Sequence, residues 1–393
     1  MTKTALVYPF PMHLSQGYTY HLSILQYVCA LSEFLEVHLL SLDTESQIIE
    51  IIENQFGWKK PDSLIIRTTK NKYFGLRSNT LFFRWNILRN IHKIHSECDQ
   101  LLIYTRNVKL ASFIFPVSRL TLKNSWRIFE CHQIYSINLS IEKRFKEAKK
   151  EYLLEQRLYS NCDLVFVNTS ILAHLIKRDY DTRVARLPVA TTEPAKYAVD
   201  QTVARHYDFA YTGTFSQWKG VDVLLEALSL IAGSGWQGRA ILVGVNEQDI
   251  TKWTSIIDEF NLSQHVKLKA KIERHFINDI LDQTKIGVVP NSLEDDSILG
   301  TSPLKLYDYA SRGCHIVATK IPALVSEELA PDLRWATPNN AKDLASTMKQ
   351  ALLSWEQSSI ANLNWVSEHS WRNRAKRALS EINELSDIDV QLK

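Results

Sequence analysis

Residue types that bind phosphate and ribose occur at helical spacing in one stretch, SPLKLYDYASRG. Thr301 or Ser302 can cap a helix with Pro303 in its first turn, where the missing amide costs nothing, and the free N–H groups then face an anion. Lys305 opposes the helix dipole unless a bound diphosphate supplies negative charge. Asp308, one turn later, can accept hydrogen bonds from two ribose hydroxyls. We predict a nucleotide site here; a capped core helix with a solvated Asp308 is the alternative.

A second candidate is the turn YTGTFSQWKG, where an expected strand ends at Gly213 and a helix follows. A glycine lets a diphosphate approach the backbone, and Lys219 supplies a cation for the charge that grows as a phosphate leaves. Close packing alone would also explain the glycine. The turn therefore favours a phosphate contact only together with the first stretch.

A third candidate is His132, at the end of the expected strand in RIFECHQ. A lone histidine is more often structural than functional. If the two halves of the chain face each other, His132 lies opposite the phosphate site, which favours a catalytic role.

Parallel sheets must position these residues, because ligands bind outside the carboxyl ends of parallel strands. Short apolar runs alternate with helical periodicity in both halves, and the pattern restarts at YDFAYTGTF. This alternation predicts an α/β fold with two Rossmann-like domains. We place an N-terminal domain at 1–190, a C-terminal domain at 200–370, and a last helix at 371–393; the family resemblance given below implies that the first binds the acceptor, the second binds the nucleotide-sugar, and the helix crosses back.

Composition favours a globular protein: 45% of the 393 residues are hydrophobic and 23% are charged. The longest apolar runs are of strand length, and the apolar run at the N-terminus is too short for a secretory signal. Five scattered cysteines form no C-x-x-C pair, which disfavours disulfides and zinc. We expect a cytoplasmic protein, and the net charge of +3 does not indicate nucleic acid.

Charge is concentrated between Trp58 and His95, where nine Lys or Arg residues accompany a single acid, Asp62. Aromatic residues are interleaved with them, and residues 80 to 95 can form a helix. A basic, aromatic, amphipathic stretch suits anionic lipid headgroups, such as those at the inner face of a membrane. An ordinary helix with a buried aromatic face is an equal alternative; nucleic acid is a poorer one.

These segments resemble the retaining glycosyltransferases of the GT-B fold, specifically the large family numbered 4, over essentially the whole chain. YTGTFSQWKGVDVLLEAL is similar to the family's glycine, arginine, lysine turn, and SPLKLYDYASRGCHIVAT to its donor-binding helix and following strand. SWRNRAKRA resembles the helix that crosses back. In the N-terminal half, Gly17, the ECH of His132, and Glu155 with Asp163 and Ser170 are similarly placed.

Two departures from the family pattern concern the donor. The family usually has an arginine where this chain has Thr214, and it pairs two glutamates where this chain has Gly300 and Asp308. Ribose binding is compatible with the shorter aspartate. The missing first glutamate bears on sugar choice and on activity.

The resemblance implies a sugar transfer with retention, from a nucleotide-diphosphate sugar to a glycan or lipid-linked acceptor in polysaccharide or glycoconjugate synthesis. It implies no cofactor and no metal, with a solvated acidic loop at Glu294 in place of a metal site. His132 and Lys219 are then catalytic, and Gly17 and Arg106 lie on the acceptor side. The donor-binding residues are Gly213, Thr214, Lys219, Ser302, Pro303, Leu304, Lys305 and Asp308.

Other functions are compatible with the same fold. A sugar-nucleotide epimerase or a phosphorylase would share the two domains, and a non-catalytic nucleotide-sugar-binding protein would keep the binding residues. Gly300 and Thr214 are the support for the last of these.

Overall fold

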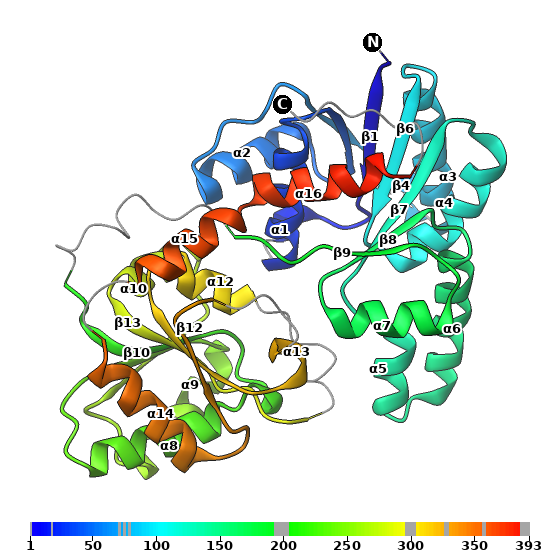
Figure 1. Cartoon of the computed structure of the whole chain (residues 1–393). Helices are drawn as coiled ribbons and strands as arrows, with labels where there is room; N and C mark the ends of the chain where they lie inside the picture. Colours follow the sequence, from blue (N-terminus) through cyan, green and yellow to red (C-terminus); the bar gives the residue numbers. More distant parts are fainter. Residues whose placement is uncertain are drawn as a thin grey trace. The chain divides into compact units, whose positions relative to one another are not determined.

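The chain forms two compact units in a computed structural model, which describes residues 2–16, 19–69, 72–73, 76–77, 80–191, 204–294, 304–325, 330–355 and 359–385. Unit 1 comprises Met1–Pro188 with Trp371–Lys393, and unit 2 comprises Val189–Ser370. Each unit is an α/β domain around its own parallel sheet (Figure 1). The predicted fold class is confirmed.

The sheet of unit 1 has seven strands in the order β3-β2-β1-β6-β7-β8-β9, all parallel. In chain order they are β1 (Thr4–Pro9), β2 (Glu36–Ser41), β3 (Leu64–Thr68), β6 (Gln100–Thr105), β7 (Ser125–Cys131), β8 (Leu164–Val167) and β9 (Val184–Arg186). Its central strands are almost continuously apolar because both faces are covered, as in β8, where every residue is buried. A short antiparallel hairpin joins β4 (Lys72–Tyr73) to β5 (Leu76–Arg77).

The helices of unit 1 are α1 (Thr19–Leu31), α2 (Glu45–Phe56), α3 (Thr80–His95), α4 (Val108–Thr121), α5 (Tyr135–Ile141), α6 (Phe145–Tyr159), α7 (Ser170–Asp179) and α16 (Trp371–Asn383), with the 3-10 turn η1 (Leu14–Gln16). Local signals set several ends: Thr44 and Gln47 form a capping box at α2, and Asn107 and Thr169 cap α4 and α7. The returning helix α16 packs on α1 (Figure 1).

The sheet of unit 2 has six parallel strands in the order β12-β11-β10-β13-β14-β15. They are β10 (Tyr207–Thr212), β11 (Ala240–Val245), β12 (Val266–Ala270), β13 (Thr284–Val289), β14 (His315–Thr319) and β15 (Leu333–Ala336). The helices are α8 (Val221–Gly233), α9 (Ile250–Glu259), α10 (Arg274–Asp282), α12 (Leu304–Ala310), α13 (Pro322–Val325), α14 (Ala341–Leu353) and α15 (Ile360–Glu368), with the 3-10 turns η3 (Gln217–Lys219) and η4 (Glu247–Asp249).

Alternate residues of β10 face two different cores. Phe209 and Tyr211 pack with α8 and α14 on one face, and Ala210 packs with α12 on the other. Both cores hold the sheet rigidly, so the loops at the carboxyl ends of β10, β11 and β13 have fixed starting points.

Candidate functional site

Two glycines, Gly213 directly after β10 and Gly244 near the end of β11, lie where the backbone of unit 2 comes very close together. A Cβ atom on Gly244 would lie 2.3 Å from the carbonyl oxygen of Gly213, and a Cβ atom on Gly213 would lie 2.5 Å from Nζ of Lys305. Both glycines have positive φ, 145° at Gly213 and 115° at Gly244. The backbone contact requires a glycine at 244, the positive φ favours a glycine at 213, and the side chain of Lys305, from the first turn of α12, lies against Gly213.

Lys219 ends η3, the turn that leads into α8. The next residue, Gly220, has φ 65°, and a Cβ atom there would lie 2.0 Å from the carbonyl oxygen of Pro290, so the turn is fixed against the end of β13. Nζ of Lys219 lies 3.4 Å from the ring centroid of Trp218. Burial lowers the pKa of Lys219 to about 7.

Lys305, in the first turn of α12, has a buried ammonium group that makes no hydrogen bond with any residue the structure describes. Its Nζ lies 4.0 Å from the ring centroid of Tyr211. Burial and the positive charge of Lys219 hold its pKa well below the usual range, although Asp308 opposes the shift. Lys219 and Lys305 thus lie close enough for their charges to interact, and neither forms an ion pair with any residue that the structure describes, which is the electrostatic setting of an anion site.

Asp308 lies one turn beyond Lys305 and is 5% exposed. Its two carboxylate oxygens accept hydrogen bonds from the two terminal nitrogens of Arg274, at the start of α10; the Nη1–Oδ2 distance is 2.9 Å. The alternative of a solvated Asp308 is therefore wrong. A bidentate arginine uses one lone pair of each oxygen, which leaves acceptor capacity on both for ribose hydroxyls.

The other predicted donor residues have less distinctive positions. Thr214 is exposed, and its carbonyl oxygen accepts a hydrogen bond from the hydroxyl of Tyr211 at 2.5 Å. Leu304 is half-buried at the start of α12. Ser302 and Pro303 lie outside the described residues, as does Gly17 in unit 1.

His132 directly follows β7 in unit 1 and contacts two charged groups through one atom. Its Nε2 lies 2.5 Å from Oε1 of Glu130 and 2.7 Å from Nη2 of Arg106. Two predicted residues, His132 and Arg106, are thus in contact. A single ring nitrogen cannot accept a hydrogen bond from Arg106 and donate one to Glu130 at the same time. The tautomer of His132 therefore decides which of the two hydrogen bonds forms.

Charge around His132 favours its neutral form. Burial and the positive charge of Arg106 lower its pKa to about 4, against the opposing effect of Glu130. His132 is therefore uncharged near neutral pH, and its side chain remains 27% exposed. A neutral, partly accessible imidazole can orient a ligand without repelling positive charge.

Glu130 is the buried anion that organises this cluster. It accepts hydrogen bonds from the hydroxyl of Tyr104 at 2.7 Å and from Nη2 of Arg374 at 2.9 Å. Burial opposes its ionisation, but the charges of Arg374 and Arg106 outweigh burial and hold its pKa well below the usual range. Arg374 belongs to α16, and its Nε donates to the carbonyl oxygen of Pro188.

Sequence reasoning did not identify Glu130, Arg374 or Arg274. Glu130 lies two residues before His132 in β7, so the period of a strand could have placed both on one face. No local signal marks Arg374 or Arg274, because their partners lie 244 and 34 residues away in the chain.

Metal ligands and membrane spans were also sought within the described ranges. These ranges contain no cluster of three or more His, Cys, Asp or Glu side chains that could hold a metal ion. None of the helices described is long and apolar enough to cross a bilayer.

Two α/β units, each with a parallel sheet of this topology, are the architecture of the GT-B fold. Solved structures show the same fold. Sucrose-phosphate synthase from Thermosynechococcus elongatus is 14% identical, with 98% of this chain and 99% of that chain covered and a TM-score of 0.68. Anabaena HepE in complex with UDP and glucose is 14% identical, with 97% and 99% covered and a TM-score of 0.69. S. aureus TarM in complex with UDP is 12% identical, with 98% and 100% covered and a TM-score of 0.66.

The sequence of the second unit also resembles a known family. Residues 206–354 match the family model described as "Glycosyl transferases group 1". The matched residues lie within unit 2, and the match supports glycosyltransferase activity. No curated protein matches the chain.

Proposed function

We propose that this protein is a retaining glycosyltransferase that moves a sugar from a nucleotide-diphosphate donor to a glycan or lipid-linked acceptor. The observation that carries the proposal is the pair of lysines in unit 2. Lys305 has a buried ammonium group without a hydrogen-bond partner among the described residues, and Lys219 has a pKa lowered to about 7 by burial. A diphosphate would supply the negative charge that both lack.

The lysines support a reaction without a divalent ion. A metal usually neutralises the leaving diphosphate in phosphate-bearing sites, and two ammonium groups can take that role. Asp308 would accept the ribose hydroxyls. Neutral His132, with Arg106, would orient the sugar as positive charge develops on it. HepE and TarM, the proteins in the solved complexes with UDP, support a nucleotide donor for this chain.

We also propose that residues 58–95 contact an anionic membrane, from whose inner face a lipid-linked acceptor would be reached. In α3, Phe83, Ile87 and Leu88 are buried, whereas Phe82 is 49% and Trp85 is 60% exposed. An exposed aromatic pair beside basic residues is compatible with interfacial docking.

The proposed reaction is tested by incubating the purified chain with a panel of nucleotide-sugars, with and without a metal chelator, and measuring released nucleotide. Release of one nucleoside diphosphate that persists in chelator is expected. Binding without release, in the presence of candidate acceptors, would favour a nucleotide-sugar-binding protein. Conversion of the sugar without nucleotide release would favour an epimerase. Absence of nucleotide binding would exclude all three.

A further inference from the structure

Unit 1 contains an apolar groove that the proposed donor chemistry does not use. It has a volume of about 620 Å³ and lies between α5, α6 and the end of α7. Its walls include Ile137 and Ile141 from α5, Phe145 and Tyr152 from α6, and Tyr180 after α7. A volume of this size is typical of a site for a small ligand.

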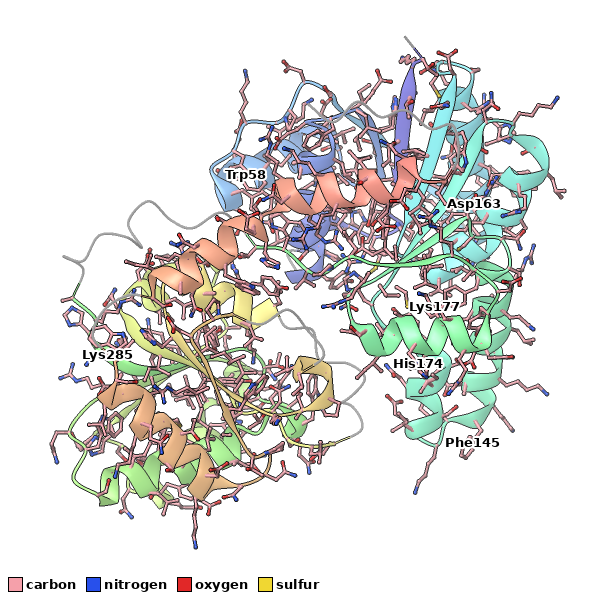
Figure 2. All side chains as sticks on the ribbon, in the orientation of Figure 1. Trp58, Phe145, Asp163, His174, Lys177 and Lys285 are labelled. Atoms are coloured by element: carbon pink, nitrogen blue, oxygen red, sulfur yellow. The ribbon has the colours of Figure 1, made fainter. Side chains whose placement is uncertain are left out.

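The groove begins close to His132. Ile134, two residues after His132, is the residue before α5 and lines the groove. Its lining continues along α5 to Phe145, where α6 begins. Phe145 lies at the outer end of the α5–α6 pair (Figure 2). A molecule lying in the groove would therefore run along α5 from Ile134 to Phe145.

Large apolar side chains of α6 are exposed beside the groove. Phe145 is 66%, Tyr152 is 43% and Leu153 is 56% exposed. Phe145, Lys149 and Tyr152 follow one another at helical spacing, so they form one stripe along the groove wall. Such a concentration of exposed apolar surface on two short helices indicates a site that something covers.

The charge beside this apolar surface is positive. Lys149 lines the groove, and the exposed residues Lys143, Lys146 and Lys150 are near it in the chain; none of the four forms an ion pair with any residue that the structure describes. The neighbouring acids are occupied: Asp179, which also lines the groove, pairs with Arg178, Glu147 pairs with Arg144, and Glu151 pairs with Lys109. Glu155 is buried and accepts a hydrogen bond from Ser136, and burial raises its pKa. An apolar groove with a lysine rim is complementary to a hydrocarbon chain with an anionic head.

We propose that the α5–α6 groove binds the hydrocarbon chain of an amphiphile with a phosphate-type head. Its role as the lipid of a sugar acceptor rests on the proposed function, glycosyl transfer. The chain covers Phe145 and Tyr152, and the anionic head meets the lysine rim. The acceptor class is then lipid-linked rather than a free glycan.

Binding is measured calorimetrically with the full chain and no nucleotide, using decyl phosphate below its micellar concentration, decyl glucoside and inorganic phosphate. Decyl phosphate should bind more tightly than either of the others. Phe145→Ser and Tyr152→Ser should each weaken both decyl compounds by about tenfold, because apolar burial is lost. Lys149→Gln should weaken decyl phosphate but leave decyl glucoside unchanged.

Matched controls separate the groove from general surface effects. Leu120→Ser removes a leucine that is 87% exposed on α4, and Lys252→Gln removes an exposed lysine of α9 in unit 2; both should bind decyl phosphate as the wild type does. Equal weakening in a control and in Phe145→Ser would overturn the proposal. So would equal affinity for inorganic phosphate, or binding to anionic vesicles without binding to monomeric decyl phosphate. Nucleotide release in the donor assay tests the proposed function separately.

Discussion

Lys219 and Lys305 are ammonium groups held within electrostatic range of each other in a partly dehydrated site. A diphosphate bound there raises the pKa of both lysines, because it favours their charged forms. Lys219 is half deprotonated near pH 7 when the site is empty, since its pKa is about 7. Nucleotide binding is therefore linked to proton uptake.

We predict that affinity for a nucleoside diphosphate falls as the pH rises above about 7, because Lys219 then loses its charge in the empty site. Calorimetry in buffers of different ionisation enthalpy should show proton uptake at pH 8. Lys219→Met should reduce that uptake and lower turnover by about 2–4 kcal/mol of transition-state stabilisation. Proton uptake that is identical in Lys219→Met would remove Lys219 from the site.

His132 is predicted to act on the sugar rather than on the nucleotide. His132→Ala should depress turnover strongly and leave nucleotide affinity nearly unchanged, because Lys219, Lys305 and Asp308 all belong to the other unit. Turnover with saturating donor and calorimetry with the nucleotide measure the two effects. Wild-type turnover in the variant would assign His132 a structural role.

At the scale of elements, one ion pair joins α10 to α12. Asp308→Ala should weaken binding of a ribonucleoside diphosphate by about 1.5–3 kcal/mol, because a hydrogen bond to a charged group is lost. Binding of the 2′-deoxy nucleotide should be weakened less. The affinities of the two nucleotides for the variant should therefore differ less than their affinities for the wild type. Arg274→Met serves as the control for lost helix packing. If wild type and Asp308→Ala discriminate equally between the two nucleotides, the ribose assignment fails.

The returning helix α16 contributes Arg374 to a buried ion pair in which Arg374 and Glu130 are each 4% exposed. Arg374→Met should destabilise unit 1 by about 3–5 kcal/mol, because it leaves a buried carboxylate without its partner. The double variant with Glu130→Gln should recover part of that loss. Urea unfolding monitored by fluorescence measures the free energy of unfolding of each variant. If the losses of the two single variants simply add in the double variant, the pairing is contradicted.

The pH dependence of this loss has a definite sign. The folded-state pKa of Glu130 is depressed, so its stabilising effect is fully present above the ordinary glutamate value of about 4.3 and disappears as the pH falls through the folded-state value. The stability difference between wild type and Arg374→Met should therefore shrink on acidification below pH 4.

For the molecule as a whole, membrane contact through residues 58–95 is predicted to be electrostatic. The wild type should sediment with anionic vesicles at low salt and be released at high salt, because exposed charge is screened beyond about 8–10 Å. Neutral substitutions at Arg77, Arg84 and Arg89 should abolish sedimentation. Nucleotide affinity should be unchanged in that variant, and a wild type that does not bind at low salt would favour an ordinary surface helix.

Local sequence determines much of the fold. Apolar runs bounded by helical periodicity predict most strands of both sheets but not the edge strands β3, β9 and β15, and the strand ends identify Gly213, His132 and Lys219 as candidates. These inferences succeed because strand burial and the turn after a strand depend on neighbouring residues. The same reasoning locates α3 and the start of α12 near Lys305.

The tertiary structure alone decides which charges meet. Arg274 reaches Asp308, and Arg374 reaches Glu130, across segments that no periodicity connects. The lowered pKa of Lys305 also depends on the tertiary structure, because it arises from burial and from the charge of Lys219, which is distant in the chain. Pairing and burial depend on how distant elements pack, so sequence spacing identifies chemical groups, and packing determines their partners and their charge.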